Sequence, residues 1–245
     1  MNNKVIDVEG IITNTKNYGD TSKIIDILTK EYGVIGVMAK GCKSLKSNLR
    51  SVTDKLTYAN FTIYYKKDKL SLLSEASIIN NFSNIKKDIE KISYASFLID
   101  LTNQVYKQSN DSDLYDLLIS SLTKINEGFN PLVITNIIEL KYLEYLGVMP
   151  NLTGCSICGS KNVITLSSDK GGYLCRKCRT NEPIVSEKAI KLVRMYTLVD
   201  INKISKLDLN KDIIREVNGF IDLYYDRYTG LYLKSKEFLN KLKTS

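Results

Sequence analysis

The hydrophobic period of this chain changes once, near residue 80, and this change constrains the fold more than any other feature. Before it, short runs rich in β-branched and aromatic residues are joined by hairpin-length turns, whereas beyond it apolar residues recur at helical spacing. Strands followed by helices are typical of an α+β chain built from separate units. We therefore expect two domains, a strand domain over residues 1–80 and a helical domain over residues 81–245.

The strand domain contains five expected strands. Gly33 supplies the positive φ of one hairpin turn, and the lysine-rich segment 66–69 forms another. Five strands joined mostly by hairpins within about eighty residues predict a small closed barrel. An OB-fold is one candidate, and the pattern alone does not separate it from an SH3-like barrel. The expected strands cover residues 5–15, 22–29, 34–38, 56–65 and 70–79.

The helical domain is punctuated by capping residues. Asn130 is an expected N-cap with Pro131 in the first helical position, and Gly147 lies just past the end of that helix. Ser186 caps a later helix, and Gly230 interrupts the last helical pattern. These signals predict a helical bundle. The helical patterns cover residues 85–106, 112–128, 130–147, 186–199 and 211–243.

A module over residues 151–182 interrupts the bundle and contains two C-x-x-C pairs. Cys155 and Cys158 form the first pair, Cys175 and Cys178 form the second, and the sixteen residues 159–174 separate them. This spacing lies within the range of zinc sites, and the segment between the pairs has the pattern of a small hairpin, as in a zinc ribbon. Four thiolates complete a tetrahedral Zn²⁺ shell with no position left for water. We therefore predict one structural Zn²⁺.

Two disulfides or a redox dithiol are the competing interpretations of these cysteines. The N-terminus lacks the cationic and apolar regions of a secretory signal, and no apolar run is long enough to span a membrane. We therefore expect a cytoplasmic protein with reduced thiols, which favours the metal. Cys42 stands alone and is expected to be a small buried hydrophobe. The cations expected to neutralise the thiolates rather than to contact a partner are Lys161, Arg176, Lys177 and Arg179.

The chain contains no histidine, which removes the commonest general base and every Ser-His-Asp or Cys-His nucleophile. Two carboxylate pairs, Asp20 with Asp26 and Glu139 with Glu144, have no catalytic motif behind them. We interpret the second pair as solvated surface on an amphipathic helix. We expect a protein that is not an enzyme.

Most of the net charge of +8 is concentrated in the strand domain. Residues 36–70 carry eight cations, opposed only by Asp54 and Asp68. Cations follow phosphates, and the aromatic residues of segment 58–65 offer faces on which bases can stack, as single-strand binding requires. A lysine-rich overall composition and a core role for the aromatic residues are the alternative explanations. The residues that we expect to bind DNA are Lys40, Lys43, Lys46, Arg50, Lys66, Lys67 and Lys69.

Five short motifs follow one another along almost the whole chain. They are Tyr18-Gly-Asp-Thr-Ser22, Ile27-Leu-Thr-Lys-Glu-Tyr-Gly33, Ala39-Lys-Gly41 followed by Lys46-Ser47, Leu146-Gly-Val-Met-Pro150 directly before the first cysteine pair, and Leu233-Lys-Ser-Lys236 with Phe238-Leu239. None of these is specific alone. In this order and spacing, they resemble the RecO family of bacterial recombination mediators.

The resemblance implies an N-terminal OB-fold and a helical C-terminal domain against which the zinc ribbon packs. It implies a DNA repair and recombination function without bond chemistry: binding single- and double-stranded DNA, annealing complementary strands, and helping to load RecA onto DNA coated by single-strand-binding protein (SSB). The implied partners are RecR and the acidic C-terminal tail of SSB, with RecA engaged indirectly, in a cytoplasmic, nucleoid-associated protein. The rival hypothesis is an interaction module whose ribbon and barrel bind RNA or a polymerase.

Overall fold

The computed structural model describes residues 4–206 and 209–243 and divides the chain into two compact units. The first comprises the residues up to Lys87 together with 112–116, and the second comprises 88–111 together with the residues from 117 onward. The change of hydrophobic period near residue 80 therefore lies close to a structural boundary. The side chain of Phe238, part of the last sequence motif, lies outside the described set.

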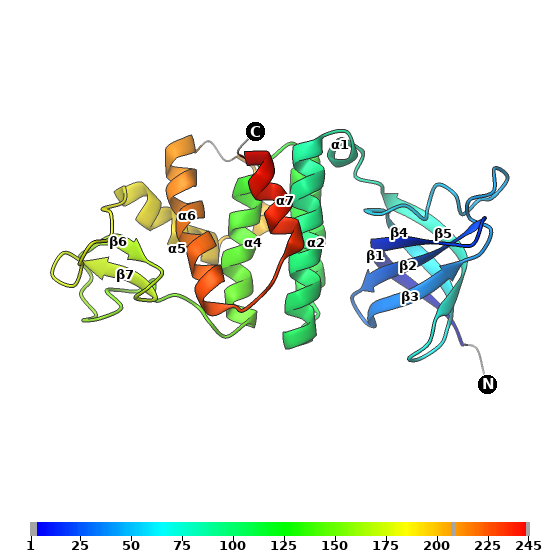
Figure 1. Ribbon diagram of the computed structural model, residues 1–245, viewed down its shortest axis with the longest axis horizontal. Coiled ribbons are helices and arrows are strands. Elements are labelled where there is room, and N and C mark those ends of the chain that lie inside the picture. The colour runs from blue at the N-terminus through cyan, green and yellow to red at the C-terminus, as the bar shows by residue number, and fades with distance from the viewer. Residues whose placement is uncertain (1–3, 207–208, 244–245) are drawn as a thin grey trace. The chain divides into compact units, whose positions relative to one another are not determined.

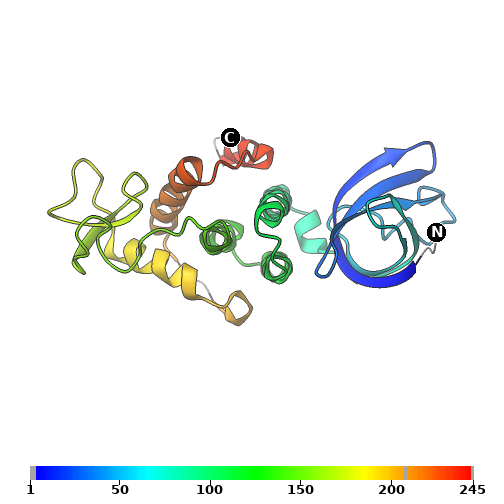
Figure 2. The ribbon, with the colours of Figure 1, turned by 90° about the horizontal axis from the view of Figure 1, so that it is seen from below.

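The first unit is a closed five-stranded barrel, as expected, and its strands follow the order β1-β2-β3-β5-β4. β1 pairs antiparallel with both β2 and β4, while β3 and β5 pair parallel and complete the ring (Figures 1 and 2). This closed Greek-key arrangement is the OB-fold. Its strands are β1 (Lys4–Tyr18), β2 (Ser22–Thr29), β3 (Gly33–Ala39), β4 (Tyr58–Tyr65) and β5 (Ser71–Asn80).

The barrel core follows from the alternation of its strands. In β3, every second residue is buried, and Ile27, Phe61 and Ile63 from neighbouring strands are completely buried. Gly10 is required where β1 passes β2, because an added Cβ would lie 2.5 Å from a methyl group of Ile27. Cys42 lies in the same core, which confirms it as a small buried hydrophobe.

The first helical pattern divides where the sequence predicts a continuous helix from Ile85. A short helix, α1 (Ser83–Lys86), is followed by α2 (Ile89–Ser109). The break occurs because the Asp88 carboxylate accepts hydrogen bonds from the backbone N–H groups of the first turn of α2 and caps a new helix there. The expectation of one continuous helix is therefore wrong at this point.

The second unit is a bundle built around α4. Its predicted N-cap is confirmed, since the Asn130 side chain accepts from the N–H groups of Leu132 and Val133 at 3.0 and 3.2 Å, and Gly147 has a φ of +69° beyond the helix end. Figure 1 shows α4 between α2 and α6, and it also contacts α5. The helices are α3 (Asp113–Asn126, of which the first turn belongs to the first unit), α4 (Pro131–Tyr145), α5 (Glu187–Leu198), a 3₁₀ turn (Ile201–Lys203), α6 (Lys211–Tyr228) and α7 (Lys234–Lys243).

The expectation that Glu139 is solvated surface is wrong. Neighbouring helices cover α4 on several sides, so it is apolar almost all round and Glu139 is only 2% exposed. Its carboxylate acts on Lys236 of α7: burial lowers the pKa of that ammonium, but Glu139 and Asp222 raise it more, and the net shift is upward. The Lys236 ammonium itself pairs with Asp222 of α6 at 3.1 Å, so opposite charges connect α6 and α7.

The cysteine module forms a two-stranded antiparallel ribbon of β6 (Val163–Ser167) and β7 (Gly172–Cys175), as the hairpin pattern predicts. A bridge between Asn151 and Gly172 joins the entering chain to β7, and only glycine fits there because a Cβ would lie 2.3 Å from the Asn151 carbonyl oxygen. No helix among residues 4–206 and 209–243 is long and apolar enough to cross a membrane.

Candidate metal centre and nucleic-acid interface

The structure brings the four predicted metal ligands together. The Sγ atoms of Cys155, Cys158, Cys175 and Cys178 all lie within 4.8 Å of one another, and those of Cys158 and Cys175 are 3.7 Å apart. A tetrahedral ion bound at about 2.3 Å to each sulfur requires sulfur–sulfur distances of roughly 3.8 Å. None of the cysteines forms a disulfide. The quartet can therefore hold a metal ion.

Two similar turns orient the four thiols toward one another. In the first turn, the Gly159 N–H donates to the Cys155 carbonyl at 2.8 Å, and in the second, the Arg179 N–H donates to the Cys175 carbonyl at 3.0 Å. Gly159 adopts a φ of +74°, which a residue with a side chain rarely does. The same local geometry at the two ends of the ribbon explains the repeated two-residue spacing.

The electrostatics of the quartet favour a cation. Burial raises the pKa of the Cys155 thiol. Backbone hydrogen bonds at Cys175, Cys158 and Ile157 lower this pKa by more than burial raises it, and the resulting pKa is about 6. The pKa of Cys178 moves the other way, to about 12, because hydrogen bonding with the Cys158 thiol favours its neutral form. The four groups therefore cannot all be thiolates unless a positive ion compensates them.

Two of the four cations near the quartet are bound within the module. The Lys161 ammonium donates to the Thr153 carbonyl at 2.9 Å, and the Arg179 guanidinium donates to the Glu182 carbonyl. Arg176 and Lys177 are exposed. Lys161 and Arg179 thus have a structural position in the module, and the neutralising role expected for them stays a prediction.

The seven predicted DNA-binding cations are all exposed, and they form two groups. Lys40, Lys43, Lys46 and Arg50 lie in the β3–β4 loop, which covers residues 40–57. Lys66, Lys67 and Lys69 lie in the β4–β5 hairpin, residues 66–70. None of the seven forms an ion pair with any residue that the structure describes. The lysine-rich barrel therefore presents two unneutralised cationic segments.

The β3–β4 loop is held by successive turns. The N–H groups of Ser44, Ser47 and Arg50 each donate to the carbonyl three residues earlier, at 3.1–3.2 Å. One end is fixed to the start of β2, where the Lys43 N–H donates to the Thr21 carbonyl at 2.8 Å. Asp54, the only carboxylate of the loop, pairs with Lys23 of β2 at 2.8 Å. Lys40, Lys43, Lys46 and Arg50 thus lie on a folded backbone and form no ion pair with any residue that the structure describes.

The β4–β5 hairpin lies beside the other end of β2. The ring of Tyr65 is 5.3 Å from that of Tyr32, which follows β2, and both line a hollow of about 380 Å³ with Lys66 and Lys69. β2 has eight residues and so spans roughly 25 Å. The two cationic segments therefore lie toward opposite ends of the barrel (Figure 1).

The aromatic residues of β4 differ in their availability for stacking. Phe61 is completely buried, and Tyr58 packs against Phe82 with ring centroids 6.3 Å apart while its hydroxyl donates to Glu9. Tyr64 is 39% exposed and Tyr65 is partly exposed. Sequence alternation marks all four as strand residues. Phe61 has no exposed face, and the partly exposed rings of Tyr58 and Tyr65 each lie against a neighbouring ring, so Tyr64 is the most accessible of the four. Strand alternation gives no signal for Tyr32, which lies in the turn after β2 and is 37% exposed.

Taken together, these sites define a class of protein: an OB-fold barrel with exposed cations, combined with a helical bundle that carries a four-cysteine ribbon. Residues 1–82 match the family description "Recombination protein O N terminal", and residues 86–237 match "Recombination protein O C terminal". The chain belongs to the RecO family.

Curated relatives agree over nearly the whole length. The chain is 34% identical to "DNA repair protein RecO" of Halalkalibacterium halodurans over 241 residues, which is 96% of this chain and 94% of the relative. It is 33% identical to the protein of the same name from Listeria monocytogenes (96% and 93%) and 32% identical to that of Bacillus subtilis (96% and 94%). The match therefore includes both units, and the family is one of DNA repair proteins.

Proposed function

We propose that this protein is a recombination mediator that binds single- and double-stranded DNA, anneals complementary strands and helps to load RecA onto SSB-coated DNA. One observation carries the proposal: a single barrel presents two exposed, unneutralised cationic segments near opposite ends of β2. The barrel domain, residues 1–80, would hold DNA. The domain over residues 81–245 would support the contacts with RecR and the acidic tail of SSB.

The separation of the two segments suggests how annealing would proceed. Roughly 25 Å along β2 exceeds the screening length of about 8 Å at physiological salt, so each segment attracts phosphates independently. Lys43, Lys46 and Arg50 would bind one strand, while Lys66, Lys67 and Lys69 would bind another. Two strands held on one small domain meet at raised local concentration and with reduced mutual repulsion. Annealing then needs no catalytic residue, and we propose a mediator rather than an enzyme.

We propose Zn²⁺ as the ion of the cysteine quartet. Four soft thiolates in a tetrahedral arrangement are typical of structural zinc, and a closed shell leaves no position for a reactive water. Bound there, the ion would supply cross-linking of the two turns. Thiols that bind zinc must stay reduced, which agrees with a cytoplasmic, nucleoid-associated protein.

The decisive experiment measures annealing of complementary oligonucleotides coated with the cognate SSB, with and without this protein. We expect acceleration on coated strands, which requires a contact with SSB as well as with DNA. Acceleration on bare strands alone would contradict the mediator role and leave only DNA binding. If neither is accelerated and matched RNA strands bind more tightly than DNA, the RNA- or polymerase-binding module becomes the better hypothesis.

Two matched variants test the two-segment mechanism. K43A/K46A/R50A and K66A/K67A/K69A each remove three charges from one segment, and either triple substitution should slow annealing of bare strands at least tenfold. A third variant, K188A/K191A/K203A, removes three exposed charges from the second unit and should anneal normally. Normal annealing by either barrel variant would show that one segment suffices.

A further inference from the structure

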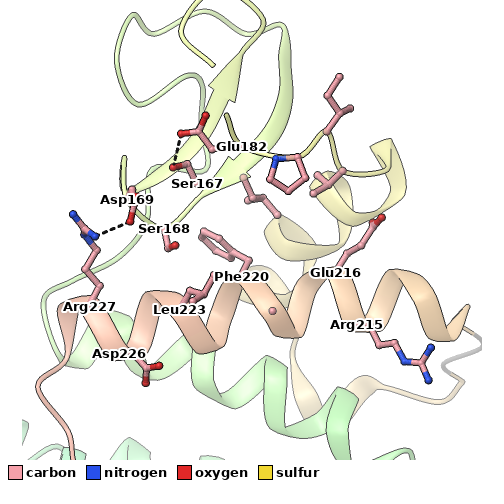
Figure 3. A pocket seen from close by; sticks show the side chains of 15 residues that line it. Ser167, Ser168, Asp169, Glu182, Arg215, Glu216, Phe220, Leu223, Asp226 and Arg227 are labelled. Atoms are coloured by element: carbon pink, nitrogen blue, oxygen red, sulfur yellow. Dashed lines mark hydrogen bonds and ion pairs between the residues drawn. The ribbon is translucent and has the colours of Figure 1, made fainter. Parts of the chain in front are cut away.

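A groove of about 800 Å³ lies between α6 and the chain segment that follows the ribbon, within the second unit (Figure 3). Phe220 and Leu223 of α6 point into it from one side, and Pro183 and Ile184 line the other. Leu223 is 61% exposed and Ile184 is 59% exposed. Large apolar side chains facing each other across an open groove are typical of a surface that binds another molecule. We call this feature the ribbon–α6 groove.

Gly219 leaves part of the groove empty. It lies inside α6, where glycine disfavours the helix relative to alanine, and it is also among the groove-lining residues. An added Cβ would have no atom within 4 Å, so packing within the described chain does not require glycine at this position. The missing side chain instead leaves space beside Phe220 for an occupant to approach the helix closely.

The charges around the groove are mainly negative, although the chain as a whole is positive. Four carboxylates and two guanidinium groups line it, and the Arg227–Asp169 pair at 2.6 Å closes one end. Arg215 and Asp226 both point away from the groove (Figure 3), and Asp226 pairs with Lys236 at 3.8 Å. The lining residues with charged side chains are Asp169, Glu182, Arg215, Glu216, Asp226 and Arg227.

Two of these carboxylates are fixed beside the apolar surface. Glu216 accepts from the Ser186 hydroxyl at 2.7 Å, and Glu182 accepts from the Thr180 N–H at 2.8 Å. Backbone N–H groups, first its own and then that of Thr180, lower the pKa of Glu182 and keep it ionised. Neither residue forms an ion pair with any part of the chain that the structure describes. Their negative charge is therefore available to a visiting cation.

We propose that the ribbon–α6 groove docks a segment of a partner protein in which apolar side chains alternate with basic ones. Apolar residues of the segment would cover Leu223 and Ile184, the two large exposed apolar side chains of the groove, while its lysines or arginines would face Glu182 and Glu216. An acidic tail or a nucleic-acid phosphate would be repelled by the same carboxylates. The groove is therefore a second interaction surface, separate from the DNA-binding segments and from any slot for the acidic tail of SSB.

Two synthetic peptides test this charge preference on the metal-loaded full chain. One fluorescein-labelled 12-residue peptide alternates lysine with leucine, and its matched partner has glutamate in place of lysine. We expect fluorescence anisotropy to show at least tenfold tighter binding of the lysine peptide. The net charge of +8 favours the glutamate peptide through nonspecific attraction, so the opposite preference must arise locally. Equal or tighter binding of the glutamate peptide would overturn the proposal.

Substitutions that add or remove side-chain volume in the groove test whether the lysine peptide binds there. Gly219→Leu should weaken the lysine peptide at least tenfold, while the better helix propensity should raise the melting temperature of the unit by about 2–4 °C. Leu223→Ala should weaken binding about fivefold, whereas Leu198→Ala, a 73% exposed leucine of α5 outside the groove, should change nothing. Unchanged binding of the lysine peptide in Gly219→Leu would overturn the proposal. Gly219→Leu should anneal bare strands normally, so this proposal and the proposed function can fail separately.

Discussion

The barrel and the cysteine ribbon are both built from antiparallel strands, but they solve the problem of holding those strands together differently. The barrel closes its sheet into a ring around a continuous apolar core. The ribbon has two strands and a core of little more than Leu174, Val163 and the cysteines themselves. Two strands cannot bury enough apolar surface to be stable alone. The comparison shows a division of labour: apolar packing holds the barrel together, and four thiols hold the ribbon together.

Removal of the metal should have the largest effect, because it should unfold the ribbon while the barrel stays folded. Structural zinc contributes about 10–16 kcal/mol in small zinc-binding peptides, far more than any one side chain of the ribbon core. We expect Cys155→Ser, or a strong chelator, to abolish protection of the Leu174 amide in hydrogen exchange. Protection of Ile63 in the barrel should persist.

The matched control for this prediction is Cys42→Ala, which removes a buried cysteine of the barrel and should leave one zinc per chain in metal analysis. A Cys155→Ser protein with a normal melting temperature and a protected Leu174 amide would contradict the structural role of the ion.

A cavity in the barrel core should destabilise the barrel and leave the zinc-bound ribbon unchanged. Phe61 is completely buried, and replacing such a phenylalanine with alanine costs about 3–5 kcal/mol. We expect Phe61→Ala to lower the free energy of unfolding of the first unit by that amount in urea titration, with zinc content unchanged. Tyr64→Ala, at a partly exposed position on the same strand, should cost less than about 1 kcal/mol. Loss of zinc in Phe61→Ala would show that the two regions are coupled.

The salt dependence of DNA affinity should distinguish the cations of the barrel from those of the ribbon. Each phosphate contact on single-stranded DNA contributes about 0.7 to the slope of log affinity against log salt, so K43A/K46A/R50A should reduce the slope by about 2. The measurement is fluorescence anisotropy with a labelled oligonucleotide at several salt concentrations. An unchanged slope would exclude these three residues from the interface.

The smallest expected effect concerns the ribbon. Arg176→Ala with Lys177→Ala removes two exposed cations beside the thiolates, and we expect the slope for DNA to stay within about 0.5 of the parent value. Zinc affinity should fall instead, as judged by competition with a chelator, because the charge of the thiolates is less well compensated. A slope reduced by more than 1 would place these cations in contact with DNA.

Local signals in the sequence predicted local structure well. The Asn130 cap, the helix after Ser186 and the paired cysteine turns each depend on residues within a few positions, and the structure confirms them. Asp88 carried the same kind of signal, since aspartate is a favoured N-cap, but the apolar period from Ile85 ran through it and suggested one helix. The two local signals disagree here, and the helix begins where the capping residue predicts rather than where the apolar period begins.

Features that depend on distant neighbours could not be predicted in the same way. Glu139 lies at a helix position that reads as surface, yet helices from elsewhere in the chain cover it. The ribbon–α6 groove combines residues near 183 and 220, and no periodicity in either segment indicates it.

The double pairing of β1 also has a consequence for the order in which the barrel folds. Its end pairs Tyr18 with Ser22 across a tight turn, whereas its start pairs Lys4 with Tyr65, near the end of β4. The first contact closes a very short loop and the second closes a long one, whose greater loss of chain entropy slows its formation. The three-stranded meander of β1, β2 and β3 should therefore form first, and docking of β4 should set the folding rate. The cationic β3–β4 loop is the segment that this last step must bring into place.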